Sequence, residues 1–103
     1  MHTVVHEVRS PPDRPLALWI EPWGDEIVLP TGAVGELRAT SPEAGDLEIV
    51  PEERGVVIYA WSGATLQVFA SGSMLQDYTY PVPYVPAGMS VRAFLGVVLG
   101  PDS

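Results

Sequence analysis

The stretch PLALWIEPWG, residues 15–24, decides how this chain folds. Its first part alternates as a β-strand does, and one face is aliphatic: Leu16, Leu18 and Ile20. The strand ends at Glu21-Pro22-Trp23-Gly24, where proline and glycine favour a tight turn. Because residues 26–29 are again β-prone, residues 15–29 are predicted to form a hairpin on which later strands pair or pack.

Short β-prone segments continue along the chain, with turn residues about every eight to twelve positions. The other predicted strands are residues 3–8, 34–40, 47–50, 56–61, 64–70 and 73–78. This spacing is typical of an antiparallel β-sandwich or small barrel. The chain is therefore predicted to be one mainly β domain, residues 1–103, with about seven or eight short strands.

Three further expectations concern how these strands are arranged. Residues 34–40 have few large apolar side chains, which favours a place at a sheet edge. Residues 56–78 contain three strands joined by tight turns and are predicted to form a meander. The acids are concentrated in residues 1–54, so the almost uncharged residues 55–103 are expected to form the centre of the core, or else an apolar partner surface.

The C-terminal part has a different pattern. In YPVPYVPAG, residues 80–88, prolines alternate with apolar residues, which predicts an extended strap over residues 79–89 that crosses the outside of the sheets. Residues 90–99 are predicted to form a short helix, with Ser90 as its N-cap and Gly100-Pro101 as its stop. The frequent valines and Gly96 leave a last β-strand as the alternative.

The charge of the chain limits its partners. Thirteen acids and five arginines, with no lysine, give a net charge of −8. Such a chain is poorly suited to bind nucleic acid or an anionic membrane, but it permits a basic protein partner or a cation. The complete use of arginine in place of lysine is typical of a GC-rich bacterial genome.

Cysteine and targeting signals are missing from this sequence. With no cysteine, there is no disulfide framework and none of the common cysteine-containing zinc sites. The first residues do not resemble a signal peptide, and no apolar run reaches the length of a membrane span. We therefore expect a cytoplasmic protein.

The acidic turn is the candidate site: Glu21, Trp23, Asp25 and Glu26. Paired carboxylates beside an aromatic ring can act on a sugar, and the three acids of the turn together with Asp46 or Glu48 could bind calcium. The spacing matches no EF-hand loop, and acids at a hairpin turn are ordinarily solvated surface. The sequence predicts no packing partner for Trp23, which is why the turn is singled out for binding.

Catalytic motifs are not found elsewhere. His2 and His6, the only imidazoles, lie four positions apart on a predicted strand, too far along it to act as a pair. The sequence contains no GxSxG, no P-loop and no GxGxxG. We expect no enzyme, no catalytic residues, no metal site and no cofactor.

Aromatic side chains give the remaining signal. Three of them lie opposite the aliphatic faces of their strands: Trp19, Tyr59 and Phe69. We expect the strap and the C-terminal helix to cover them, through Tyr84, Phe94 and Leu95. The alternative is a partly open aromatic surface that binds a partner.

Two functional hypotheses follow. The first is a non-catalytic protein-interaction module, such as an adaptor or an immunity-type inhibitor of a basic partner. The alternative is a ligand-binding module for a carbohydrate or a divalent cation at the turn of residues 21–26. The sequence does not specify the oligomeric state.

Overall fold

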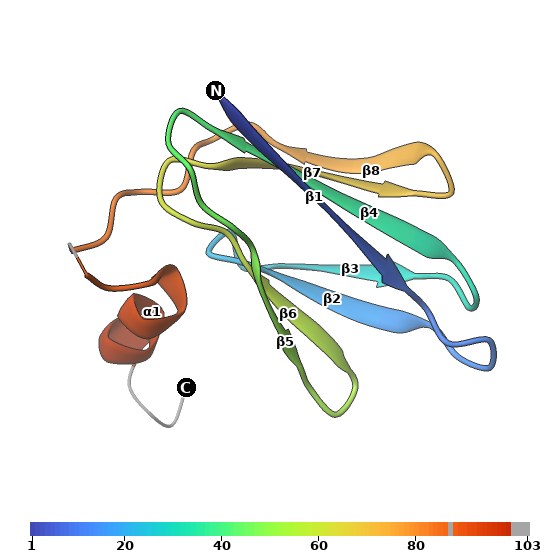
Figure 1. Cartoon of the computed structure of the whole chain (residues 1–103). Helices are drawn as coiled ribbons and strands as arrows, with labels where there is room; N and C mark the ends of the chain where they lie inside the picture. Colours follow the sequence, from blue (N-terminus) through green and yellow to red (C-terminus); the bar gives the residue numbers. More distant parts are fainter. Residues whose placement is uncertain (87, 100–103) are drawn as a thin grey trace.

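The computed structural model describes residues 1–86 and 88–99, and it is mainly β (Figure 1). Two four-stranded sheets pack face to face. Sheet A has the order β1-β4-β7-β8, made by His2–Arg9, Val34–Ser41, Thr65–Ala70 and Ser73–Tyr78. Sheet B has the order β3-β2-β6-β5, made by Asp25–Leu29, Leu16–Glu21, Gly55–Tyr59 and Glu48–Pro51. The predicted β-sandwich is confirmed.

The opening hairpin forms as predicted. Strands β2 and β3 pair antiparallel, from Leu16 opposite Leu29 to Ile20 opposite Asp25. Gly24 adopts a φ of +75°, a conformation that glycine tolerates best, and its N–H donates to the carbonyl of Ile20 at 2.9 Å. The turn residues therefore set the register of this hairpin.

One strand pair differs from the antiparallel expectation. Strand β2 pairs with β6 in parallel, with Ala17 opposite Gly55 and Glu21 opposite Tyr59. The chain leaves sheet B after β3, forms β4 in sheet A, and returns as β5 and β6. Because of this excursion β6 runs in the same direction as β2, and β2 lies in the interior of its sheet.

Two predictions about strand arrangement are wrong. The three strands within residues 56–78 do not form a meander, because residues 60–64 cross from β6 in sheet B to β7 in sheet A. Strand β4 is not at an edge but lies between β1 and β7. Its small inward residues are needed for close packing: a Cβ on Gly35 would lie 2.8 Å from Cδ1 of Leu29.

The core lies between the two sheets and is drawn from both halves of the chain. The first half supplies Leu18, Ile20, Leu29, Leu37, Ala39 and Leu47. The second half supplies Ile58, Ala60, Ala64, Leu66, Val68, Val82 and Val91. The predicted aliphatic faces thus form the core, and residues 55–103 supply seven of its buried side chains together with six from residues 1–54. Each fully buried leucine or isoleucine stabilises the fold by about 1.5–3 kcal/mol through the hydrophobic effect.

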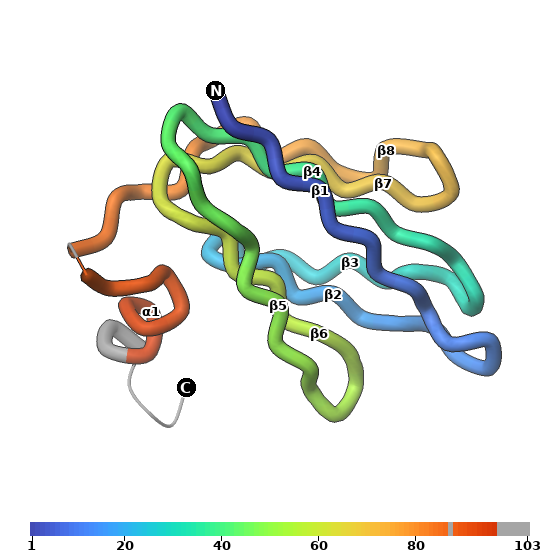
Figure 2. The backbone as a smooth tube through the Cα atoms, in the orientation of Figure 1, coloured from blue at the N-terminus to red at the C-terminus, as the bar shows by residue number. Residues whose placement is uncertain are grey.

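The C-terminal helix is confirmed as α1, Val91–Leu99. The hydroxyl of Ser90 accepts a hydrogen bond from the N–H of Ala93 at 3.0 Å, as an N-cap does. The predicted stop at Gly100-Pro101 lies outside the described residues. Figures 1 and 2 place α1 at one end of the two sheets. No helix in the described part of the chain is long and apolar enough to cross a membrane.

The strap is anchored at its centre. Val82 is buried, and its N–H donates to the carbonyl of Ala64 at 2.9 Å while its carbonyl accepts from Gly63 at 2.8 Å. The predicted strap therefore adds a side chain to the core and does not merely cross the outside of the sheets.

Candidate functional site

The structure divides the predicted acidic turn between two surfaces. Glu21 and Glu26 lie on the outer face of sheet B, because their neighbours Ile20 and Ile27 point toward the core. Trp23 and Asp25 instead contact the end of β8 and the segment that follows it. The four residues therefore do not form one site.

Trp23 has a packing partner that the sequence did not predict. Its ring stacks on Tyr78 with a centroid separation of 4.9 Å and an interplanar angle of 24°. Its Nε1 donates to the carbonyl of Tyr80 at 3.1 Å. The hydroxyl of Tyr78 in turn donates to Oδ2 of Asp25 at 2.7 Å. The absence of a partner was the reason for singling out Trp23, and the stack with Tyr78 removes that reason.

This contact also affects the titration of Tyr78. Burial, the hydrogen bond to Asp25 and the charge of that carboxylate all raise the pKa of the phenol above its usual value. Tyr78 therefore stays protonated at physiological pH and keeps donating to Asp25. We name this arrangement of Trp23, Asp25 and Tyr78 the β8 clasp.

The carboxylates of the turn do not converge on a point. Within residues 1–86 and 88–99, no group of three or more His, Asp or Glu side chains could hold a metal ion. The alternative hypothesis of a divalent-cation site at residues 21–26 therefore gains no geometric support.

The outer face of sheet B carries the most distinctive combination of side chains. Trp19 lies directly opposite Glu26 on one side and Val57 on the other. We call this surface the Trp19 face, and it consists of Ala17, Trp19, Glu21, Glu26, Val28, Glu48, Val50, Val57 and Tyr59. Its residues are half-buried or exposed, and the side chain of Val28 is 54% exposed. The face is thus apolar and acidic at once.

One row of the Trp19 face places an aromatic ring between two carboxylates. Tyr59 is opposite Glu21 on β2 and opposite Glu48 on β5. Nη1 of Arg92, from α1, lies 2.8 Å from Oε2 of Glu48, and the guanidinium carbon lies 6.0 Å from the centre of the Tyr59 ring. We call Glu21, Tyr59 and Glu48 the Tyr59 row. Its geometry suits a cation that stacks on the ring.

The electrostatics of the row agree with this geometry. Burial raises the pKa of the Glu21 carboxyl above its ordinary value. The hydrogen bond to Glu48 raises the pKa of Arg92. Burial raises the pKa of Tyr59, and the positive charge of Arg92 opposes that shift. The carboxylate of Glu21 is therefore a group whose charge a bound cation would stabilise.

A cavity of about 310 Å³ adjoins the Tyr59 row. It lies between the loop before β5, the strap and the start of α1, and its polar and aromatic lining includes Asp46, Glu48, Tyr59, Trp61, Tyr84 and Arg92. Nε1 of Trp61 donates to the hydroxyl of Ser41 at 2.9 Å, which fixes the indole against the loop. The cavity combines aromatic walls with carboxylates, as the Trp19 face does.

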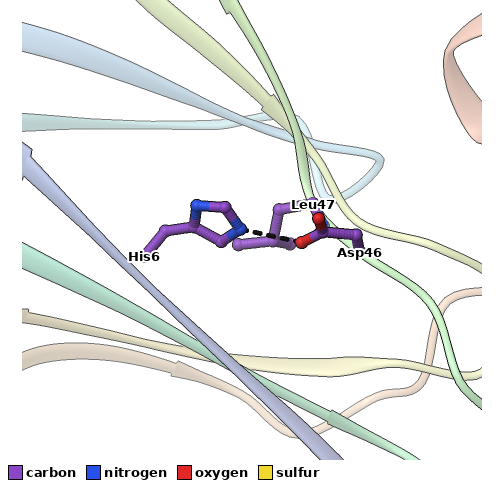
Figure 3. A network of polar contacts seen from close by, with 3 residues as sticks. All are labelled: His6, Asp46 and Leu47. Atoms are coloured by element: carbon purple, nitrogen blue, oxygen red, sulfur yellow. Dashed lines mark hydrogen bonds and ion pairs between the residues drawn. The ribbon is translucent and has the colours of Figure 1, made fainter.

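A polar contact between β1 and the loop before β5 lies at the edge of sheet A opposite the β8 clasp (Figure 3). Nε2 of His6 on β1 lies 2.7 Å from Oδ1 of Asp46, and the N–H of Leu47 donates to the same oxygen at 2.8 Å. These bonds lower the pKa of Asp46, the His6 contact most. We name this pair the β1 clasp. It gives His6 a structural role.

The expectation that the strap and helix cover Trp19, Tyr59 and Phe69 together is wrong, although α1 does reach Tyr59 through Arg92. Trp19 and Tyr59 lie on the outer face of sheet B. Phe69 lies on β7 in sheet A, with the guanidinium carbon of Arg38 5.3 Å from the centre of its ring. The side chain of Tyr84 is 67% exposed, so it covers little. The crossing between β6 and β7 separates the aromatic residues onto opposite surfaces, and residue patterns within single strands do not show this.

The Tyr59 row is predicted only in part: the sequence indicates Glu21 as a site residue and Tyr59 as part of a possible partner surface, but not their meeting with Glu48 and Arg92. Arg92 is the only basic residue in residues 55–103. Such an isolated base is expected to form an ion pair with an acid from elsewhere in the chain. Its partner Glu48 is 44 positions away, and no local pattern reveals that distance. Comparisons with protein-family models, with curated proteins and with solved structures found no match.

Proposed function

We propose that this protein is a non-catalytic interaction module that binds a basic protein partner through the Trp19 face. The observation that carries the proposal is the combination of Trp19 and Tyr59 with Glu21, Glu26 and Glu48 on one outward sheet face. Aromatic residues serve well as interface anchors, and carboxylates beside them select positive partners. An adaptor, or an immunity-type inhibitor of a basic enzyme, would work in this way.

The opposite face of the sandwich differs in its charges. On sheet A the arginines and acids neutralise each other locally: Arg9 pairs with Glu7 at 3.3 Å, and Arg38 with Glu36 at 2.7 Å. On sheet B neither Glu21 nor Glu26 forms an ion pair within the described residues. The acidic charge of the Trp19 face is therefore available to a partner.

The overall charge supports the same role. A net charge of −8 produces a long-range field that accelerates encounter with a basic protein. Such steering weakens with salt, because the screening length at physiological ionic strength is only about 8 Å. We therefore expect added salt to weaken the part of the affinity that comes from the charges, and to change the part that comes from the aromatic anchor much less.

The proposal is tested by calorimetric titration with a blocked peptide of alternating arginine and glycine, at low and at physiological ionic strength. Glu26→Gln should weaken binding about two- to fivefold, because it removes one carboxylate beside the anchor. Trp19→Leu should weaken binding by at least about fivefold. Thermal melts establish that both variants remain folded.

The matched control is Glu7→Gln, which makes the same chemical change on the outer face of sheet A. It should leave the affinity close to that of the parent protein. An equal loss in Glu7→Gln and Glu26→Gln would mean that only net charge matters, and no binding at low ionic strength would also overturn the proposal.

A further inference from the structure

Arg92 binds the Trp19 face from within the same chain. Its guanidinium contacts Glu48 and lies over Tyr59, so it makes the contacts that a cationic side chain of a partner would make there. We propose that the Tyr59 row is the binding site for an arginine side chain of the partner, and that Arg92 occupies this site in the free protein as an internal competitor. This inference rests on the proposed function. It identifies the chemical group that binds and the residue of this chain that competes with it.

The shape of the row favours a guanidinium over an ammonium group. A guanidinium is planar and stacks on an aromatic ring while its N–H groups reach carboxylates at the edges. Tyr59 supplies the ring, and Glu21 and Glu48 lie on the two neighbouring strands directly opposite it. Arg92 uses Glu48 and leaves Glu21 without an ion pair in the described part of the chain. An arginine from a partner can approach both acids.

Arg92 is placed so that it can be displaced. The side chains of the ion pair are 51% exposed for Arg92 and 42% exposed for Glu48, and exposed pairs of this kind are weak. Val91 keeps the start of α1 in the core, so displacement requires only the Arg92 side chain to move. The adjoining cavity of about 310 Å³ gives a second side chain room to enter. Exchange of one arginine for another therefore leaves the core between the sheets intact.

A second arginine in the same chain shows what a purely local pair looks like. Arg38 lies 5.3 Å from the centre of the Phe69 ring and pairs with Glu36 at 2.7 Å, on the opposite outer face. Arg38 and Glu36 are two positions apart on β4, an interior strand, whereas Arg92 and Glu48 are 44 positions apart and joined through α1. Arg38 is thus a matched control: it makes the same kind of ion pair and ring contact, but within one strand and away from the Tyr59 row.

The test uses the blocked pentapeptide Gly-Gly-Arg-Gly-Gly, with lysine and citrulline counterparts, titrated into the full chain and followed by NMR chemical shifts. Arg92→Gln should bind the arginine peptide about two- to fivefold more tightly than the parent, because the competitor is removed. Arg38→Gln, which changes the net charge equally, should bind with the affinity of the parent. The lysine and citrulline peptides should bind more weakly to every form.

Each other outcome has a defined meaning. Equal tightening in Arg92→Gln and Arg38→Gln would show an effect of net charge and overturn the inference, while the proposed function stands. No tightening, or weaker binding, in Arg92→Gln would show that Arg92 only anchors α1, and this also overturns the inference. If the arginine–glycine peptide fails to bind as well, the proposed function falls with it.

A second variant guards against loss of the helix. Arg92→Lys keeps the charge that pairs with Glu48 but removes the planar group that stacks on Tyr59. Its affinity for the arginine peptide should lie between those of the parent and Arg92→Gln. Glu48→Gln introduced into Arg92→Gln should reverse the gain, and a gain that survives this change would place the peptide elsewhere.

Discussion

At the scale of single residues, Trp23 shows how a residue that resembles a binding site can be structural. Its indole stacks on Tyr78 and its N–H is bonded to the carbonyl of Tyr80. A ring with one side stacked and its polar atom satisfied has less to offer a sugar or a peptide. Trp19, four positions earlier on the outer face of β2, is the better anchor because Glu26 lies directly opposite it and no ring stacks on it within the described residues.

The β8 clasp gives a prediction about one hydroxyl group. Tyr78→Phe keeps the stack on Trp23 but removes the 2.7 Å hydrogen bond to Asp25, so it should lower the free energy of unfolding by about 0.5–1.5 kcal/mol. Chemical denaturation measures this difference. Tyr80→Phe deletes the same group from a side chain that is 82% exposed and should change stability very little. Equal effects in the two variants would mean that the hydrogen bond to Asp25 contributes nothing.

At the scale of elements, the parallel pairing of β2 with β6 requires a glycine. A Cβ on Gly55 would overlap the carbonyl oxygen of Ala17, the residue opposite it. Backbone atoms cannot yield as the end of a flexible side chain can. Gly55 is thus needed for close approach of two strands, although it also ends the charged turn before β6.

This requirement predicts different outcomes for two glycine substitutions. Gly55→Ala should destabilise the protein by about 1–3 kcal/mol or more, because β2 and β6 must move apart. Gly96→Ala, within α1 and with open space around it, should instead stabilise the helix by up to about 1 kcal/mol. Thermal unfolding followed by circular dichroism compares them. A mild effect at residue 55 would contradict the tight β2–β6 contact.

The strand positions could be predicted from the sequence, but their sheet assignment could not. Alternating side chains and turn residues are local, which is why the predicted strands lie close to the observed ones. The choice of sheet depends on crossings such as residues 60–64, and no local pattern shows whether a turn continues a sheet or leaves it. The same limit applies to the site. The sequence indicates Glu21, Glu26, Trp19 and Tyr59 as candidates, but their place on one sheet face with Glu48 and Arg92 follows only from the fold.

At the scale of the whole molecule, two clasps join the sheets at opposite sides of the sandwich. The β8 clasp connects an edge of sheet A to the β2–β3 turn, and the β1 clasp connects the other edge to the residue before Leu47. The β8 clasp contains a half-buried aromatic stack, whereas the β1 clasp is a more exposed pair of side chains. We therefore expect the β1 clasp to be the weaker and the more sensitive to pH.

The sign of that sensitivity follows from Asp46. Its pKa is lower in the folded protein than its ordinary value of 3.8, so its contribution to stability is complete above about pH 4 and is lost as the pH falls through the folded pKa. Asp46→Asn should cost about 0.5 kcal/mol at neutral pH, and the difference should vanish in acid. Denaturation at several pH values measures this. Asp13→Asn, at an exposed position, is the control.

The parallel contact between β2 and β6 also has a consequence for how the chain is made. During synthesis β2 can pair with β3 as soon as both have emerged, but its other side has no partner until β6 has left the ribosome. In the same way, β4 can pair with β1 but lacks its second partner until β7 has emerged. Long-range pairing of this kind gives a high contact order and slow folding. An N-terminal fragment that ends before residue 55 lacks a required strand of each sheet and should be unfolded alone, so the domain forms only after β6 and β7 have been synthesised.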